Sequence, residues 1–169
     1  MNYAFLAGTI AAALVASAPS RAQQVTTKDQ LIGTWQVETL TLTRGGEATH
    51  PLGEHPSGYV TFTPERMWLL FVDSSRKMPA SPTLSDAEAV TMMKTQVAWT
   101  GKYTVGEQTP DGIKITAHVD TASSQAIVGN DRVYFVRVEG DKITFKSPGV
   151  VEPMTGKFTP LEFTMTRSQ

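Results

Sequence analysis

The stretch LIGTWQVETLTL, residues 31–42, decides the fold class of this chain. Gly33 and Trp35 open a run in which threonine, valine and leucine recur, a composition typical of β-strands. Seven further short runs of β-branched and aromatic residues follow, and several alternate between apolar and polar residues. We therefore predict an all-β fold with strands at residues 33–43, 58–63, 66–73, 98–105, 112–120, 131–138, 142–147 and 160–167.

The lengths of the links between these runs predict how the strands are arranged. The links at 63–65, 106–111 and 139–141 are short and contain turn-forming proline, glycine or aspartate residues. In an up-and-down antiparallel barrel, alternate links lie at opposite ends. The short turns would then form a closed end, the floor, and the long links an open end, the mouth. We predict an eight-stranded antiparallel up-and-down barrel with room for one small ligand. The long links are residues 44–57, 74–97, 121–130 and 148–159.

The link between the third and fourth runs contains a helical pattern. A Ser-x-x-Glu capping box begins at Ser85, and Val90, Met93 and Val97 follow at helical spacing. We predict one α-helix over residues 85–97. Two roles stay open for it: a movable lid over the mouth, or a helix packed permanently across the opening.

The N-terminal residues have the features of an export signal. Residues 4–16 are apolar, and small residues at Ser20 and Ala22 favour signal-peptidase cleavage before Gln23. Cleavage before Pro19 is an alternative, whereas a membrane anchor is disfavoured because the apolar run is too short to span a bilayer. We predict a signal peptide at residues 1–22, one barrel domain at residues 23–169, and a periplasmic or secreted protein.

Charge and composition exclude several classes of protein. Arg21 is the one charged residue of the predicted leader, so the mature chain keeps 14 basic and 16 acidic residues, a net charge of −2. This weak negative charge argues against a nucleic-acid partner and against stable membrane insertion. The chain has no cysteine, which excludes disulfides, thiol catalysis and thiolate metal sites. Hydrolase, kinase and dinucleotide-binding motifs are also absent.

Trp35 and the C-terminal arginine form the first candidate pair. Alternation places Arg167 on the same face as Phe163 and Met165, which is an apolar face. The first and last strands of a closed barrel are neighbours, so we predict a cation–π contact between Arg167 and Trp35 at the floor. The alternative is a core tryptophan with an unrelated surface arginine.

At these residues the sequence resembles the lipocalins, whose first strand carries Gly-x-Trp and whose last strand supplies an arginine that packs on that tryptophan. More closely, it resembles the bacterial lipocalin-like domain family. The resemblance implies a lipocalin (calycin-type) barrel, and lipocalin-like barrels that act as pericyclases permit an enzymatic role. The chain departs from the family at Ala117, where many relatives have a second histidine beside His118. The resembling stretches are LIGTWQVETL, PLGEHPSGYVTFTPERMW, GKYTV, HVD and VGNDRVYFVRVEGDKITF.

Aromatic and polar residues near the mouth are the candidate site. His118 and Asp120 lie on one face of a strand, which faces outward by simple alternation and inward only if a β-bulge intervenes. Together with Tyr103 they are the candidate catalytic residues, because histidine, aspartate and tyrosine can move protons. We expect no cofactor and no metal site, since the histidine spacing matches no metal motif. The candidate ligand-binding residues are Tyr59, Phe71, Trp99, Tyr103, His118 and Arg132.

Three functions stay open on this sequence. The first is an exported carrier that binds a small hydrophobic or aromatic molecule in an internal cavity. The second is a cofactor-free isomerase, cyclase or lyase that acts on a small hydrophobic substrate in the same cavity. The third is an interaction protein of the cell envelope whose barrel is filled solid. An acid–base pair that points into the cavity would favour the enzyme over the carrier. A barrel without a cavity would favour the interaction protein.

Overall fold

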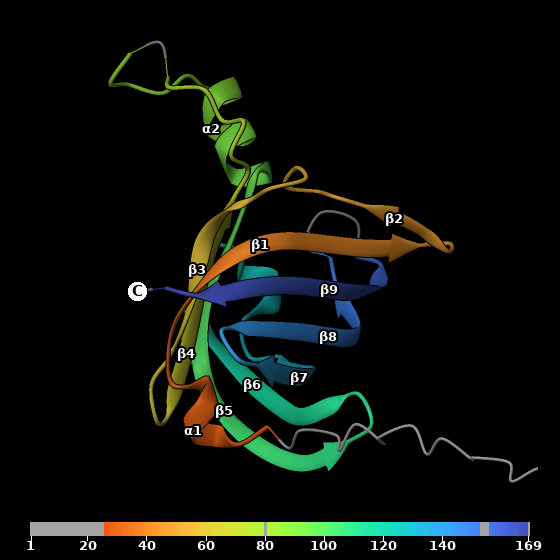
Figure 1. The fold of residues 1–169 in the computed structure, drawn as a ribbon. Helices are drawn as coiled ribbons and strands as arrows, with labels where there is room; N and C mark the ends of the chain where they lie inside the picture. Colours follow the sequence, from red (N-terminus) through yellow and green to blue (C-terminus); the bar gives the residue numbers. More distant parts are fainter. Residues whose placement is uncertain (1–25, 80, 153–155, 169) are drawn as a thin grey trace, which may run out of the picture.

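The structure, a computed structural model, describes residues 26–79, 81–152 and 156–168. The predicted signal peptide lies outside these residues. The described chain forms one antiparallel sheet in which each barrel strand pairs with the next, and the last strand pairs with the first. The predicted eight-stranded barrel is confirmed (Figure 1). Its strands are β1 (Gly33–Arg44), β3 (Ser57–Phe62), β4 (Arg66–Val72), β5 (Gln96–Thr109), β6 (Gly112–Ala122), β7 (Asp131–Glu139), β8 (Lys142–Val151) and β9 (Phe158–Arg167).

Short additional elements lie in the links and before the first strand. Strand β2 (Glu47–Thr49) folds back on the end of β1, and it was not predicted. A 3₁₀-helix, η1 (Gln125–Ile127), lies in the link between β6 and β7. The links between β3 and β4, β5 and β6, and β7 and β8 are short, as expected, and those from β1 to β3, β4 to β5 and β6 to β7 are long. Strands β8 and β9 extend further than predicted, so the link between them covers residues 152–157 instead of 148–159.

Alternation along the strands places the apolar residues inside the barrel. In β6, for example, Ile115, Ala117 and Val119 are fully buried. Much of the barrel interior is filled by aromatic rings in contact with one another. The shortest of these contacts joins the stacked rings of Phe145 and Phe163, whose centroids are 4.6 Å apart. The contacting aromatic residues are Phe62, Phe71, Trp99, Tyr103, Tyr134, Phe145 and Phe163.

The floor is closed by the short helix α1 (Lys28–Leu31), which precedes β1. Trp35 is fully buried, and its Nε1 donates a hydrogen bond to the carbonyl oxygen of Leu31 at 2.8 Å. The guanidinium carbon of Arg167 lies 4.1 Å from the centroid of the indole ring, so the predicted pairing is confirmed. Arg167 also donates to the carbonyl oxygens of Gln30 and Ile32, which fixes α1 to β9.

A glycine is required beside this pair. Gly33 has φ +126°, a backbone conformation that other residues rarely adopt. A Cβ atom at this position would also lie 2.9 Å from Nη1 of Arg167. The Gly-x-Trp pattern therefore has a physical cause: the glycine leaves room for the arginine that covers the tryptophan.

The helix in the long link, α2 (Asp86–Lys94), begins at the predicted capping box. The hydroxyl of Ser85 accepts a hydrogen bond from the Glu88 backbone, and the Glu88 carboxylate accepts one from the Ser85 backbone. The helix ends before the predicted residue 97, because Gln96 already pairs with Val72 in the sheet. The capping pattern marks the start of a helix, whereas tertiary pairing decides its end.

Helix α2 projects away from the barrel and buries none of its residues (Figure 1). Of the two roles considered for it, a helix packed permanently across the opening is therefore excluded. The side chain of Arg76 holds the helix to its link, because it donates to the carbonyl oxygen of Met92 and to the hydroxyl of Thr95. The mouth thus stays open beside the helix.

Candidate functional site

A pocket of about 360 Å³ opens at the mouth of the barrel. Its walls come from the mouth ends of β1, β5, β7, β8 and β9, from the links that contain Leu52 and Ile127, and from the last turn of α2. The volume lies near the lower end of the range for small-molecule sites in proteins. Most of the wall is apolar, formed by Leu40, Leu42, Leu52, Met93, Val97, Ile127, Val150, Val151 and Leu161.

Arg132 is a charged residue in this apolar wall. It pairs with the inward-facing Ala117 across the sheet, so the pleat directs its side chain inward. Its Nε atom is shielded from solvent and has no hydrogen-bond partner. Among the described residues, no carboxylate lies within ion-pair distance of its guanidinium. The site therefore presents a cation that has no carboxylate partner among the described residues.

Two aromatic rings lie next to Arg132. The guanidinium carbon lies 6.0 Å from the ring centroid of Trp99, at the outer limit of a cation–π contact. Trp99 in turn stacks with Tyr134, with ring centroids 6.4 Å apart and planes 3° apart. Burial raises the pKa of the Tyr134 hydroxyl, while the neighbouring Arg132 acts in the opposite direction. These rings fill the barrel below the pocket.

The other charged groups of the pocket divide into a pair and a single lysine. Both nitrogens Nε and Nη2 of Arg44 donate to the carboxylate of Glu152, at 3.0 and 2.5 Å. This hydrogen bonding raises the pKa of Arg44, and the Thr159 hydroxyl donates to the same buried carboxylate. Lys94, at the end of α2, makes no ion pair with a described residue. The uncompensated charge around the pocket is positive.

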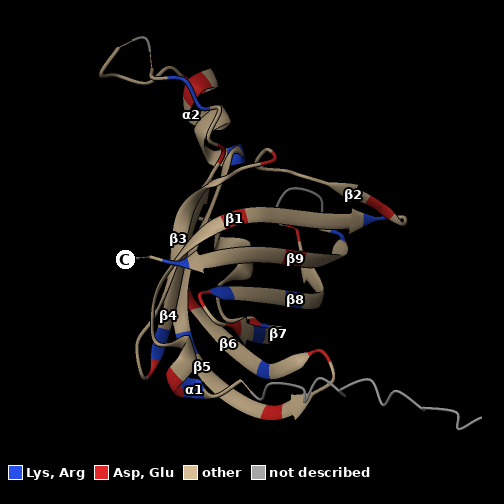
Figure 2. Cartoon of the chain, in the orientation of Figure 1, with Lys and Arg blue, Asp and Glu red and all other residues tan. Residues whose placement is uncertain are grey.

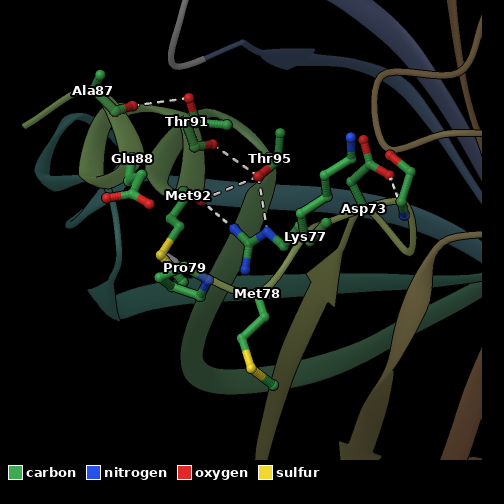
Figure 3. Close-up of a pocket in the computed structure, with 11 residues that line it drawn as sticks. Asp73, Lys77, Met78, Pro79, Ala87, Glu88, Thr91, Met92 and Thr95 are labelled. Carbon is green, nitrogen blue, oxygen red and sulfur yellow. Dashed lines mark hydrogen bonds between the residues drawn. The ribbon is translucent and has the colours of Figure 1, made fainter. Parts of the chain in front are cut away.

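A second hollow, of about 430 Å³, lies outside the barrel between α2 and the segment that precedes it (Figure 3). Asp73 and Arg76, which line it, have local partners. Hydrogen bonds from the side chain and the backbone of Ser75 lower the pKa of the Asp73 carboxyl group, and Arg76 binds the end of α2. The polar residues of this hollow therefore connect α2 to the segment that precedes it.

The three candidate catalytic residues are not brought together. His118 lies on the outer face of β6, where its Nδ1 is 2.8 Å from Oδ1 of Asp131. Asp120 also faces outward and accepts two hydrogen bonds from Arg66. A bulge does interrupt the pairing of β5 and β6 nearby, but it leaves both side chains outside. Tyr103 faces the opposite side of the sheet.

The candidate ligand-binding residues are spread over three regions. Tyr59 faces outward and is 42% exposed, which corrects the expectation that it is inside; Val60 and Phe62 take the inner positions of β3 instead. Tyr103 is buried at the floor, where its hydroxyl donates to the carbonyl oxygen of Thr63 at 2.8 Å. Phe71 and Trp99 belong to the aromatic core, and His118 is outside. Arg132 is the one of the six that lines the pocket.

The sequence reasoning missed the pocket residues supplied by the mouth links. Leu52 and Ile127 are buried although they lie in links between strands. The sequence did contain a signal for these two residues, because each is a large aliphatic residue in an otherwise polar link, which is typical of a buried position. Gln96 and Ser123 at the rim carried no signal, because single polar residues at strand ends are ordinary.

No group of three or more histidine, aspartate or glutamate side chains in the described ranges is arranged to hold a metal ion. No helix in this part of the chain has the length and apolar character needed to cross a bilayer.

Comparison with known proteins agrees with the geometry. The family model of a lipocalin-like domain matches residues 32–166, which include every strand of the barrel except the last residue of β9. No curated protein and no solved structure matched the chain. The match spans most of the sequence, and the closed barrel with its Trp35–Arg167 floor supports it. The chain belongs to the family of lipocalin-like domains.

Proposed function

We propose that this protein binds one small, predominantly apolar molecule in the pocket at the mouth of its barrel. The observation that carries the proposal is an open pocket of about 360 Å³ with a mainly apolar wall. Exposed apolar concavities of this kind are typical of small-molecule sites. A lipocalin-like barrel is a ligand-binding fold, which supports the same function.

The proposed ligand lies at the mouth rather than deep inside the barrel. Ring contacts from Phe62 through Phe145 to Phe163 fill the interior toward the floor. Tyr103 and Lys28, whose Nζ lies 5.4 Å from the centre of the tyrosine ring, add to the closure there. The part of the barrel toward the floor is therefore packed with side chains, and the pocket lies above it.

Binding is a better proposal than catalysis for this pocket. Acid–base catalysis needs a proton donor or acceptor within hydrogen-bond reach of the substrate. His118 and Asp120 are on the outer face and bonded to other side chains, and the Tyr103 hydroxyl is engaged at the floor. Nothing in the described pocket supplies a comparable acid–base pair.

We also propose that the protein is exported. The apolar leader at residues 4–16 and the small residues before Gln23 support cleavage and release outside the cytoplasm.

The binding proposal is tested with a neutral apolar fluorophore, N-phenyl-1-naphthylamine. We expect a saturable rise in its fluorescence with one molecule bound per chain. Leu161→Trp places a larger side chain in the pocket wall and should weaken binding at least tenfold. Leu70→Trp is the matched control, because Leu70 is 44% exposed on the outer face of β4 and does not line the pocket. This variant should bind the dye with the affinity of the parent protein.

Two results contradict the proposal. The first is that the parent protein, shown to be folded by circular dichroism, does not bind the dye saturably. The second is equal binding by both tryptophan variants, since it places the dye somewhere other than the pocket.

A further inference from the structure

We propose that the ligand is an amphipathic carboxylate whose head group binds Arg132 and whose apolar part fills the mouth pocket. This inference rests on the proposed function and names its ligand class. It is carried by three observations: a guanidinium in an apolar wall with no carboxylate partner among the described residues, the distribution of charge around the rim, and the contact of the arginine with a buried ring.

The first observation concerns the hydrogen-bond donors of Arg132. A guanidinium carries five N–H donors and no acceptor, and a buried donor without a partner costs free energy. The Nε donor of Arg132 is shielded from solvent and unpaired. A planar carboxylate can accept two parallel hydrogen bonds from the terminal nitrogens of a guanidinium, so it matches an arginine in charge and in shape.

The second observation is that the pocket's own carboxylate is not available to Arg132. The carboxylate oxygens of Glu152 already accept from Arg44 and from Thr159. The acidic group of the rim is thereby neutralised, while Arg132 and Lys94 carry no described counter-ion. The positive charge at the mouth would attract an anionic ligand and repel a cationic one.

The third observation is that Arg132 lies against a buried aromatic ring, which limits the positions open to its side chain. Its guanidinium lies over the ring of Trp99, which is itself buried and stacked on Tyr134. A side chain that is already ordered loses less conformational entropy when it binds. An arginine on the outer face of the same strand, Arg137, instead donates to the carbonyl oxygen of Pro110.

The apolar wall determines the remainder of the ligand. Leu40, Ile127 and Leu161 contribute hydrocarbon surface that a purely ionic ligand would leave exposed to water. A free inorganic anion therefore uses only part of this site. A medium-length alkyl chain or a small ring system with one carboxylate uses both parts.

The experiment compares three ligands that share one alkyl chain: decanoate, decan-1-ol and decylammonium. Each is titrated at pH 7.5 against the protein loaded with N-phenyl-1-naphthylamine, and its dissociation constant is obtained from displacement of the dye. In the parent protein we expect decanoate to bind at least tenfold more tightly than decan-1-ol, and decylammonium to bind most weakly. This order is read without any variant, so it does not depend on the folding of a mutant.

Variants then identify the group that selects the carboxylate. Arg132→Gln should remove the preference for decanoate and leave the affinity for decan-1-ol within about threefold of the parent. Arg132→Lys should keep part of the preference, because the charge remains but the planar fork is lost. Arg137→Gln is the matched control on the outer face of β7, and it should behave like the parent.

The outcomes separate this inference from the proposed function. If decan-1-ol displaces the dye as well as decanoate does in the parent, the site binds apolar molecules but the carboxylate assignment is overturned. If Arg132→Gln keeps the full preference for decanoate, Arg132 is not the anchor. If the parent binds neither the dye nor any of the three ligands, the proposed function itself fails, and this inference fails with it.

Discussion

At the scale of single residues, two inward-facing arginines show how position decides what a side chain does. Arg167 at the floor has a complete set of neighbours: the Trp35 ring and the carbonyl oxygens of Gln30 and Ile32. Arg132 at the mouth lies over a ring as well but has an unpaired Nε. The first arginine therefore contributes to stability, and the second is the one we assign to binding.

The contact between Trp35 and Arg167 can be measured with a double-mutant cycle. Trp35→Ala should lower the free energy of unfolding by about 3–5 kcal/mol, because it removes a fully buried indole. Arg167→Ala should cost less, and the double variant should deviate from additivity by about 0.5–2 kcal/mol, the range of a cation–π contact. Urea denaturation gives all four values.

Arg137→Ala is the control for loss of an arginine elsewhere in the barrel. Combined with Trp35→Ala, its effect should be additive, since Arg137 donates to Pro110 and is not paired with the indole. Strict additivity in the Trp35–Arg167 cycle as well would show that the two side chains do not stabilise each other.

At the scale of elements, the pairing of β5 with β6 depends on one glycine. The register shifts between Thr100 and Gly101, and the β6 backbone comes close to the glycine at this point. A Cβ atom on Gly101 would lie 2.0 Å from the carbonyl oxygen of His118. The bulge that could have turned His118 and Asp120 inward is therefore present, but it bends the sheet without reversing their direction.

A pair of alanine substitutions in β5 tests this packing. Gly101→Ala should lower the free energy of unfolding by about 1–3 kcal/mol, because the backbones of β5 and β6 must move apart. Gly106→Ala, in the same strand, should change it by less than about 1 kcal/mol, since the nearest atoms to its Cβ are 3.6 Å away. Thermal unfolding measured side by side compares the two variants, and equal losses would argue against the close approach at Gly101.

At the scale of the whole molecule, the barrel is closed at one end and open at the other. Helix α1 and the Trp35–Arg167 pair close the floor, whereas the mouth keeps a pocket beside a projecting helix α2 (Figure 1). Acidic and basic residues are interspersed over the strands rather than gathered by sign (Figure 2). Among the described residues, Arg132 and Lys94 at the mouth make no ion pair, so the pocket is positively charged on a surface of mixed charge.

The export proposal makes a prediction for the complete protein. Protein purified from its native host should have an N-terminus at Gln23, or at Pro19 if the alternative cleavage is used, because the small residues before these positions suit signal peptidase. Intact-mass spectrometry of the envelope and culture fractions measures this directly. A substitution of Ala22 by a large residue should shift or block cleavage, while recovery of the full 169-residue chain from the cytoplasm would contradict export.

The sequence by itself determined the features that depend on local patterns. Period-two alternation placed Ile115 and Ala117 inside, the link lengths sorted the turns from the loops, and the capping box located the start of α2 at Ser85. The Trp35–Arg167 contact was also accessible, because closure of an antiparallel barrel makes its first and last strands neighbours. These features follow from pleat, turn chemistry and chain order, each of which is readable over a few residues.

Only the tertiary structure decided how deep each inward residue lies and what it meets there. Alternation could not show that the aromatic rings fill the floor, that Tyr103 bonds to Thr63, or that α2 ends early and projects. It also could not show that Glu152 is occupied by Arg44 while Arg132 has no carboxylate partner. Depth and partnership depend on side chains from strands far apart in the sequence, which meet only when the barrel closes.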